Sequence, residues 1–196
     1  MRELIKMVVV LTVLTAVSGG LLAGLRAKTQ DRIEMQELQF VSAPVLEELF
    51  GDADNDMIED RFELTYQDEE VTVFPIKIDG EYRKVAFSSA GGGYGGDVGV
   101  MVGVDISNDT ITGVRVTTHS ETPGIGAKVK SNPELIMPKF EGLEVDQQFK
   151  VKSAGGEIDA ISGATVTSEG VCSGVTRAGD FYSRMKDRIK EQLNSL

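Results

Sequence analysis

The sequence predicts an α+β fold in which an antiparallel sheet packs against helices and one N-terminal transmembrane helix precedes the domain. Three stretches carry this prediction. Residues 98–106 alternate strictly between apolar and other residues, which is typical of a strand with one buried face. Residues 7–25 form an uncharged apolar run. After Thr165, apolar residues recur every three or four positions, which indicates an amphipathic helix.

The apolar run is long enough to cross a bilayer, because residues 7–25 would span about 28 Å as a helix. Basic residues flank both ends, so their distribution does not orient the helix. A cleaved signal peptide is the alternative, but the run is long for one and no clear Ala-x-Ala site follows. We therefore expect an uncleaved anchor over residues 1–27, with residues 7–25 in contact with lipid.

Residues 28–60 read as a juxtamembrane helical segment followed by an acidic loop. Pro44 should break the helix or restart it near Ala43. The acidic run at residues 51–56 lacks the alternating ligands and closing Glu of a calcium-binding EF-hand loop, so we expect a solvated loop. The remaining residues, 61–196, form the predicted main domain.

The sheet is predicted from strand patterns and turn signals. Asp79-Gly80 indicates a type I′ hairpin. Before it, the alternation changes phase at Phe74-Pro75, which favours an edge strand or a bulge. The expected strands cover residues 71–78, 81–89, 98–106 and 111–118.

Composition excludes several classes of function. The net charge of −11 argues against nucleic-acid binding, which needs clustered basic residues. Cys172 is the single cysteine and His119 the single histidine, so neither an internal disulfide nor a zinc site of several Cys or His ligands is expected. We expect Cys172 to be a small buried residue.

A glycine-rich segment, residues 91–96, literally matches the dinucleotide fingerprint G-x-G-x-x-G. That fingerprint requires a following helix, whereas here a strand follows, so a Rossmann site is excluded. The segment is predicted to be a flexible hairpin loop, or a border for a flat ligand with Tyr94 as its aromatic side chain. A second loop contains Pro123-Gly124, which fits a type II turn, directly after His119, Glu121 and Thr122.

The stretch 159–169 runs from a predicted strand through a small-residue turn into the C-terminal helix. Ser162, Gly163 and Ala164 leave room for a large group near the backbone. The hydroxyls of Thr165, Thr167 and Ser168 could cap the helix, and its N-terminus could equally hold a phosphate. The predicted apolar stripe of this helix is read as core and comprises Val171, Val175, Ala178, Tyr182, Met185, Ile189 and Leu193. The apolar residues of the 132–156 connector either fill the core or cover a pocket.

Two motifs carry a resemblance to a known family. Asp159-x-x-Ser162-Gly163-Ala164-Thr165 resembles the flavinylation motif of FMN-binding domains in the Rnf and Nqr redox complexes. The segment from His119 to Gly126 is closely similar to the His-x-Glu-Thr-Pro-Gly-x-Gly segment of the same family, in the same order. The short chain is more similar to the G-subunit type of Rnf than to the longer C-subunit type of Nqr.

This resemblance implies an FMN-binding domain over residues 61–196, with FMN esterified through its phosphate to Thr165 by a flavin transferase. It implies an electron-transfer subunit of an ion-translocating ferredoxin:NAD oxidoreductase complex, with no substrate turnover of its own. The expected partners are the other subunits of an Rnf-type complex and the lipid bilayer. The flavin domain would lie outside the cytoplasmic membrane. The implied cofactor-binding residues are Thr165, Ser162, Gly163, Ala164, Thr167, Asp159, Glu121, Thr122, His119 and Tyr94.

Three alternatives stay open at this stage. The nearest is a free-standing or Nqr-type flavinylated carrier outside the cytoplasm. A membrane-anchored module that binds a phosphorylated ligand noncovalently belongs to another class. The third is a structural membrane subunit without a cofactor.

Overall fold

The computed structural model of this protein describes residues 2–67 and 69–196. The chain begins with α1 (Arg2–Glu37), passes through a π-helical turn, η1 (Leu38–Ser42), and enters α2 (Ala43–Phe50). The predicted restart near Ala43 is confirmed, with Pro44 in the first turn of α2. The helix is not fully broken before Pro44, because the chain stays helical through the widened π turn.

Within the described residues, one helix is apolar and long enough to cross a membrane. The apolar part of α1 covers Arg2–Gln30, has a mean hydropathy of 2.2 and buries none of its most apolar window. Such exposure is what a helix requires if lipid is its solvent. The first residue of the predicted anchor, Met1, lies outside the described residues.

The contacts of the chain divide it into two units, which meet between Phe40 and Val41. The second unit, Val41–Leu196, contains α2, the acidic loop and the sheet together. The acidic loop is held to β2 (Glu69–Ile78), because Asn55 donates to the carbonyl of Pro75 and accepts from the amide of Lys77. The boundaries at residues 27 and 60 stay predictions.

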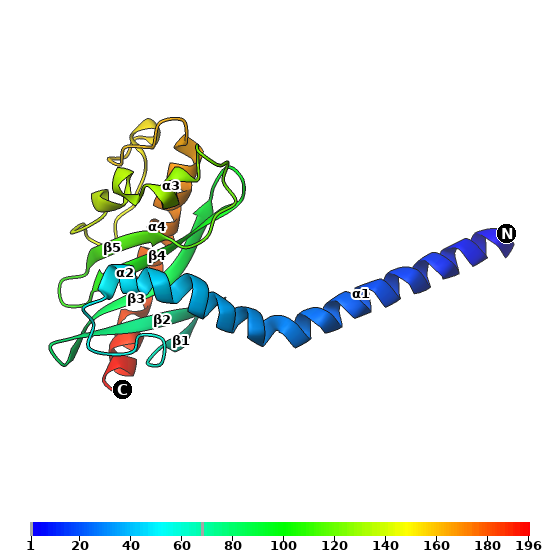
Figure 1. Cartoon of the computed structure of the whole chain (residues 1–196), viewed down its shortest axis with the longest axis horizontal. Helices are drawn as coiled ribbons and strands as arrows, with labels where there is room; N and C mark the ends of the chain where they lie inside the picture. The colour runs from blue at the N-terminus through cyan, green and yellow to red at the C-terminus, as the bar shows by residue number, and fades with distance from the viewer. Residues whose placement is uncertain (1, 68) are drawn as a thin grey trace. The chain divides into compact units, whose positions relative to one another are not determined.

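Five antiparallel strands form one sheet in the order β1-β2-β3-β4-β5, which confirms the predicted α+β class (Figure 1). The other strands are β1 (Phe62–Tyr66), β3 (Glu81–Gly92), β4 (Asp97–Asp105) and β5 (Thr110–Val116). The strand β1 was not expected from the sequence. The remaining elements are α3 (Lys128–Ser131), η2 (Pro133–Leu135), η3 (Met137–Lys139), η4 (Lys152–Ala154) and α4 (Thr165–Leu193).

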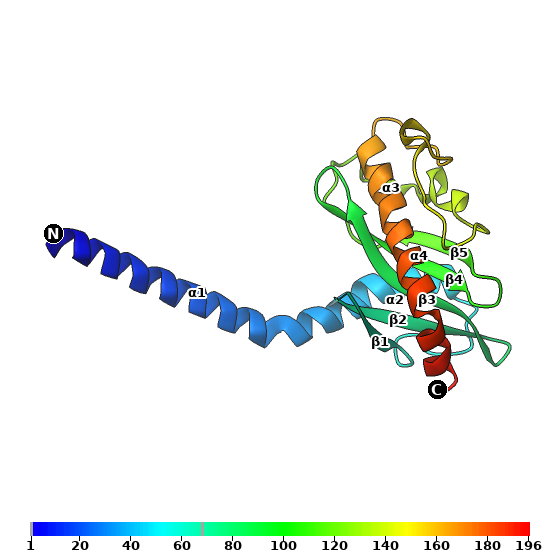
Figure 2. The same cartoon turned by 180° about the vertical axis from the view of Figure 1, so that it is seen from behind.

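Helices cover both faces of this sheet. α2 lies on one face in Figure 1, and α4 runs along the opposite face in Figure 2. The change of phase in β2 follows from this arrangement, since Val73 belongs to the core under α4 whereas Phe74 and Ile76 are buried outside that cluster. The expectation of an edge strand is therefore wrong, because β1 pairs with β2. A bulge does occur, between Ile76 and Lys77.

The hairpin at Asp79-Gly80 has the predicted type I′ geometry. Both residues have positive φ, 53° and 78°, and they connect Ile78 directly to its partner Glu81. This backbone twist matches that of the flanking strands, which explains the tight connection between β2 and β3.

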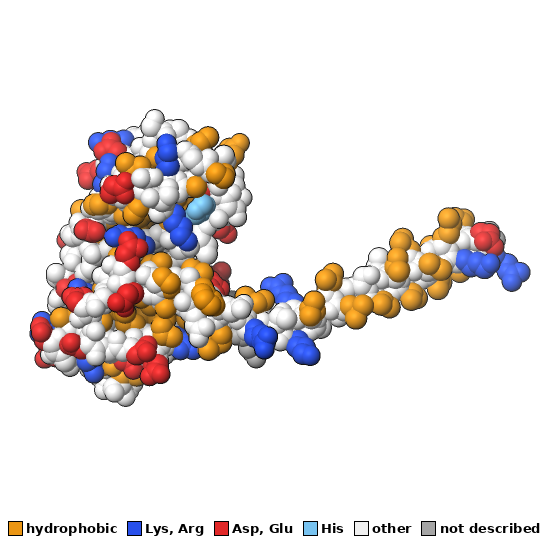
Figure 3. Space-filling view, in the orientation of Figure 1, with side chains coloured by type: hydrophobic (Ala, Val, Ile, Leu, Met, Phe, Trp, Pro, Cys, Tyr) orange, Lys and Arg blue, Asp and Glu red, His pale blue; other side chains and the backbone are white. Residues whose placement is uncertain are grey.

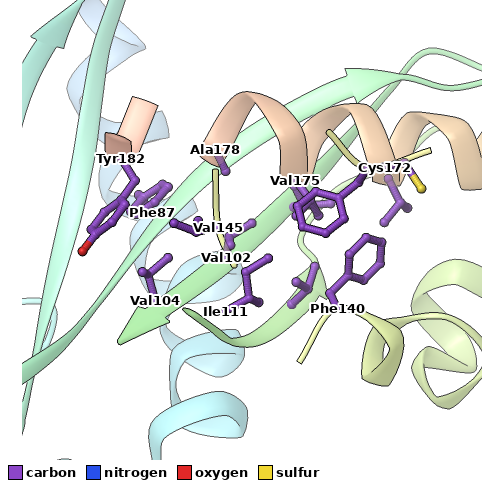
Figure 4. Packing of buried hydrophobic residues seen from close by; sticks show 14 of the residues in the cluster. Phe87, Val102, Val104, Ile111, Phe140, Val145, Cys172, Val175, Ala178 and Tyr182 are labelled. Atoms are coloured by element: carbon purple, nitrogen blue, oxygen red, sulfur yellow. The ribbon is translucent and has the colours of Figure 1, made fainter. Parts of the chain in front are cut away.

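The main core lies between the sheet and α4 (Figure 4). All seven residues of the predicted apolar stripe of α4 are buried, so its interpretation as core is confirmed. The connector at residues 132–156 also fills this core. Its buried hydrophobic side chains are Ile136, Met137, Phe140, Val145, Phe149 and Val151.

Candidate functional site

The segment before α4 is a tight turn that delivers Thr165 to the first position of the helix. The amide of Ala164 donates to the carbonyl of Ile161 at 2.9 Å, and Gly163 has φ of +79°. This combination is that of a type II turn, which requires glycine at its third residue. The side chain of Ser168 reinforces the turn, because its Oγ donates to the Ala164 carbonyl and accepts from the Ile161 amide.

The three hydroxyls at the start of α4 have different surroundings. Thr165 is exposed, whereas Thr167 and Ser168 are only 2% and 0% exposed. The residue at the N-cap is Ala164, and within the described chain no side chain caps this helix, so the expectation of a hydroxyl cap is wrong. The two buried hydroxyls are instead engaged in tertiary hydrogen bonds. The first amides of α4 therefore stay available to a ligand, with the positive end of the helix dipole behind them.

Glu121 joins this helix start to the two loops. Its carboxylate, on a residue only 5% exposed, accepts from the Gly95 amide at 2.8 Å through Oε1 and from the Thr167 hydroxyl through Oε2. The amide of Glu121 donates to Nδ1 of His119 at 3.2 Å. The structure thus brings together Glu121, Thr167, His119 and the backbone next to Tyr94.

The ionisation of Glu121 follows from these contacts. Burial raises the pKa of this carboxyl, but the hydrogen bonds from Thr167, Gly95 and Tyr94, helped by His119, outweigh burial and hold the pKa below its usual range. A buried carboxylate that keeps its charge needs such hydrogen-bond donors.

Thr122 begins the predicted turn. The amide of Ile125 donates to the Thr122 carbonyl at 3.2 Å, and Gly124 has φ of +72°, so the type II turn around Pro123-Gly124 is confirmed. The next residue, Gly126, lies directly against the network, since a Cβ there would be 2.7 Å from Oε2 of Glu121.

Tyr94 lies at the tip of a tight hairpin and not in a long flexible loop. Gly91 and Gly92 belong to β3 and pair with Val98 and Asp97, and the Gly93 amide donates to the Gly96 carbonyl. The Tyr94 side chain is 77% exposed. The backbone of this tip is therefore fixed while its aromatic ring is accessible.

Asp159 lies apart from this network. It pairs with Lys152 at 2.8 Å and Lys139 at 3.0 Å, and these two hydrogen bonds hold the pKa of Asp159 below its usual range. The first residue of the flavinylation-like motif thus ties η3 and η4 of the connector to the turn before α4.

Several residues that border the site have roles that were not expected from the sequence. Ser168, expected as a possible helix cap, instead fixes the turn, and Lys139 and Lys152 hold Asp159. Ile125 and Val166 are large apolar residues that are 49% and 45% exposed. Figure 3 shows hydrophobic side chains gathered on the surface near the histidine. For Ile125 the signal in the sequence was an apolar residue inside an otherwise polar and glycine-rich loop, and for Val166 it was an apolar residue between two threonines at the helix start. Exposure itself cannot be read from sequence.

Cys172 lies one turn beyond Ser168 and is buried, as expected. Burial, with a smaller contribution from Glu169, raises the pKa of its thiol to about 11. The thiol is therefore protonated and unreactive at neutral pH.

Comparison with known proteins agrees with this geometry. The profile of the FMN-binding domain family matches residues 93–180, which include the Tyr94 tip, the 119–126 segment and the first half of α4. The G subunit of the ion-translocating oxidoreductase complex of Stutzerimonas stutzeri is 34% identical over 146 residues, which cover 71% of this chain and 63% of that protein. The G subunit of the same complex in Vibrio cholerae serotype O1 is 29% identical over 94% of this chain and 93% of that protein.

Solved structures show the same fold. The C subunit of the Na⁺-translocating NADH-quinone reductase from Parabacteroides distasonis superposes with a TM-score of 0.51 at 26% identity, covering 66% of this chain and 67% of that one. The corresponding protein of Shewanella oneidensis gives a TM-score of 0.51 at 25% identity, covering 68% of this chain and 75% of that one.

Proposed function

We propose that the chain, whose residues 93–180 match the profile of the FMN-binding domain family, is a membrane-anchored electron-transfer subunit with FMN bound covalently to Thr165. The complex would be an ion-translocating oxidoreductase of the Rnf type, since the similar proteins from Stutzerimonas and Vibrio are named as the G subunit of such a complex. FMN supplies the redox chemistry, while the chain binds and orients it.

The accessibility of Thr165 carries this proposal. Among the three hydroxyls at the start of α4, Thr165 alone is exposed, and it occupies the first position of an uncapped helix. A flavin transferase could reach this hydroxyl. Its oxygen would bond to the phosphorus of an activated FMN donor, the hydroxyl proton would leave, and the donor's leaving group would depart with the electron pair of its bond. The product is a phosphodiester.

The residues around Thr165 fit such a group. The turn at Ser162, Gly163 and Ala164 offers little side-chain bulk, and the free amides of the first turn of α4 suit the remaining phosphate charge. The other proposed members of the site are Asp159, Thr167, His119, Glu121, Thr122 and Tyr94. To these we add the exposed side chains of Ile125 and Val166, which could contact the apolar part of an isoalloxazine ring.

The anchor sets the proposed location. α1 would span the cytoplasmic membrane once, contact lipid through residues 7–25 and leave the flavin domain on the extracytoplasmic side. Covalent attachment would keep the cofactor from diffusing away there. The partners would be the other subunits of the complex, with a flavin transferase needed for maturation, and the chain would turn over no substrate alone.

The test is expression of the full chain with a flavin transferase, followed by intact mass and in-gel flavin fluorescence. Wild type should carry an FMN adduct that survives denaturation, and Thr165→Ala should lose it completely. Ser173→Ala removes another exposed hydroxyl of α4 and should keep the adduct. A wild-type chain without an adduct, despite a competent transferase, would contradict the proposal. Flavin that is released on denaturation would favour the noncovalent phospholigand module, which the uncapped helix start also supports.

A further inference from the structure

The carboxylate of Glu121 is enclosed by the protein. Each of its oxygens accepts a hydrogen bond, from Gly95 and from Thr167. Glycines wall it on two sides, since a Cβ on Gly93 would lie 2.5 Å from Oε1 and one on Gly126 would lie 2.7 Å from Oε2. A carboxylate in these surroundings acts on the protein segments that enclose it.

Those neighbours are adjacent in the chain to the exposed residues of the site. Tyr94 precedes Gly95, Ile125 precedes Gly126, and Val166 precedes Thr167. Three segments that are distant in the sequence thus meet at one buried carboxylate, and each presents a large exposed side chain beside that meeting point. Among the exposed large hydrophobic residues in the described part of the second unit, only Leu135 and Leu196 lie outside these segments.

The acceptor turn is held by a separate contact. Ser168 bridges Ile161 and Ala164 without involving Glu121. Ser168 therefore holds the turn that presents Thr165. Thr167, the preceding residue of the same helix, joins the two loops to α4 through Glu121.

We propose that Glu121 and Thr167 are positioning residues, which hold the Tyr94 tip and the 122–125 turn against the first turn of α4 and so define the surroundings of the flavin. This inference rests on the proposed function. Loss of the contact between Glu121 and Thr167 should therefore open the surroundings of the flavin.

The experiment compares Thr167→Val, which keeps the shape of the side chain without its hydroxyl, with Thr167→Ser, which keeps the hydroxyl. Hydrogen exchange is first measured on the full chain in detergent micelles without flavin. Amides of residues 93–96 should exchange on the order of tenfold faster in Thr167→Val than in wild type, because a hydrogen bond to a buried charged group is lost. Thr167→Ser should restore protection. The strand at 99–104 should exchange at the wild-type rate in both variants.

The flavin-loaded chains give the second readout. In the flavin-loaded fraction of each variant, the flavin of Thr167→Val should be quenched more strongly by iodide than that of Thr167→Ser. Equal exchange at residues 93–96 in the two variants would overturn the inference. Exchange in Thr167→Val that rises as much at residues 99–104 as at residues 93–96 would also overturn it, because Thr167 would then only stabilise the fold. If wild type carries no flavin, the proposed function fails, whereas the exchange comparison still decides whether Glu121 and Thr167 hold the loops.

Discussion

The first and second halves of α4 meet the rest of the domain in different ways. At the start of the helix, backbone packs on backbone: a Cβ on Gly91 of β3 would lie 2.1 Å from the Gly170 carbonyl, and one on Gly174 would lie 3.3 Å from the Gly91 amide. Polar contacts there are buried, while Thr165 and Val166 remain exposed. This half combines close backbone packing with an uncapped helix end.

The second half is held by large side chains and one closed polar cluster. Tyr182 packs parallel to Phe87, with ring centroids 6.4 Å apart, and Phe181 meets Phe87 edge to face. The Tyr182 hydroxyl donates to Asp109 at 2.7 Å, and Lys186 pairs with the other oxygen of Asp109 at 2.5 Å. The hydrogen bond from Lys186 holds the pKa of Asp109 below its usual range, while burial and then Asp109 raise the pKa of Tyr182.

This difference indicates that the second half of α4 stabilises the fold and that the first half forms part of the candidate site. In the second half the polar side chains satisfy one another, as a structural contact requires. In the first half the buried polar groups position the loops and the turn, and no side chain among residues 2–67 and 69–196 caps the helix end. An open helix end of this kind is what a phosphate ligand needs.

The largest expected effect breaks the close packing of the first half. Gly91→Ala would place a methyl group against the Gly170 carbonyl, so we expect a loss of about 3 kcal/mol in the free energy of unfolding. Gly92→Ala is the matched control in the same strand, because no atom lies within 4 Å of its Cβ position. Urea denaturation of the full chain in detergent, followed by tyrosine fluorescence, measures both. Equal urea midpoints for the two variants would contradict this prediction, because they would show that α4 shifts freely on β3.

A second test concerns the buried charge of Glu121, which contacts the first half of α4. Glu121→Gln should cost about 2 kcal/mol at pH 7, because hydrogen bonds to a charged acceptor are weakened. The folded pKa of Glu121 lies below the unfolded value of about 4.3. Its contribution is therefore fully present above the unfolded pKa and is lost as the pH falls through the folded pKa. Urea midpoints of wild type and variant should converge in acid, and a gap independent of pH would contradict this assignment.

The smallest effect probes the second half. Tyr182→Phe removes one hydrogen bond to Asp109 but keeps the ring packing and the Lys186 ion pair, so we expect a loss of about 1 kcal/mol. Tyr94→Phe, on an exposed ring, is the control and should leave the midpoint unchanged. Flavin attachment should be normal in Tyr182→Phe, and a loss of attachment there would show that the two halves of α4 are coupled.

Much of this arrangement is determined locally. The alternation at residues 98–106 predicts a strand, and its valines are buried under α4 because neighbouring residues on a strand point to opposite faces. Asp79-Gly80 and Pro123-Gly124 determine their turns through the φ angles that these residues accept. The apolar run of α1 and the spacing in α4 likewise follow from composition and helical periodicity alone.

Other features depend on contacts between distant segments. The strand β1 has no strong pattern of its own and forms because β2 offers it a paired edge. The phase change at Phe74-Pro75 indicated an edge strand or a bulge, whereas burial on both faces explains it, with a bulge at Ile76 and Lys77. The hydroxyls at 165, 167 and 168 look equivalent in the sequence, yet only the fold shows that Thr167 contacts Glu121 and Ser168 contacts Ile161.

The sequence alone thus determined the motifs and the class of fold, because these depend on local geometry and residue chemistry. Its resemblance to a flavinylation motif indicated Thr165 as the residue proposed to carry the flavin. The tertiary structure decided which of three neighbouring hydroxyls is exposed and which side chains enclose Glu121. The physical reason is that burial and hydrogen-bond partners arise only where segments tens of residues apart meet, as Gly95, Glu121 and Thr167 do.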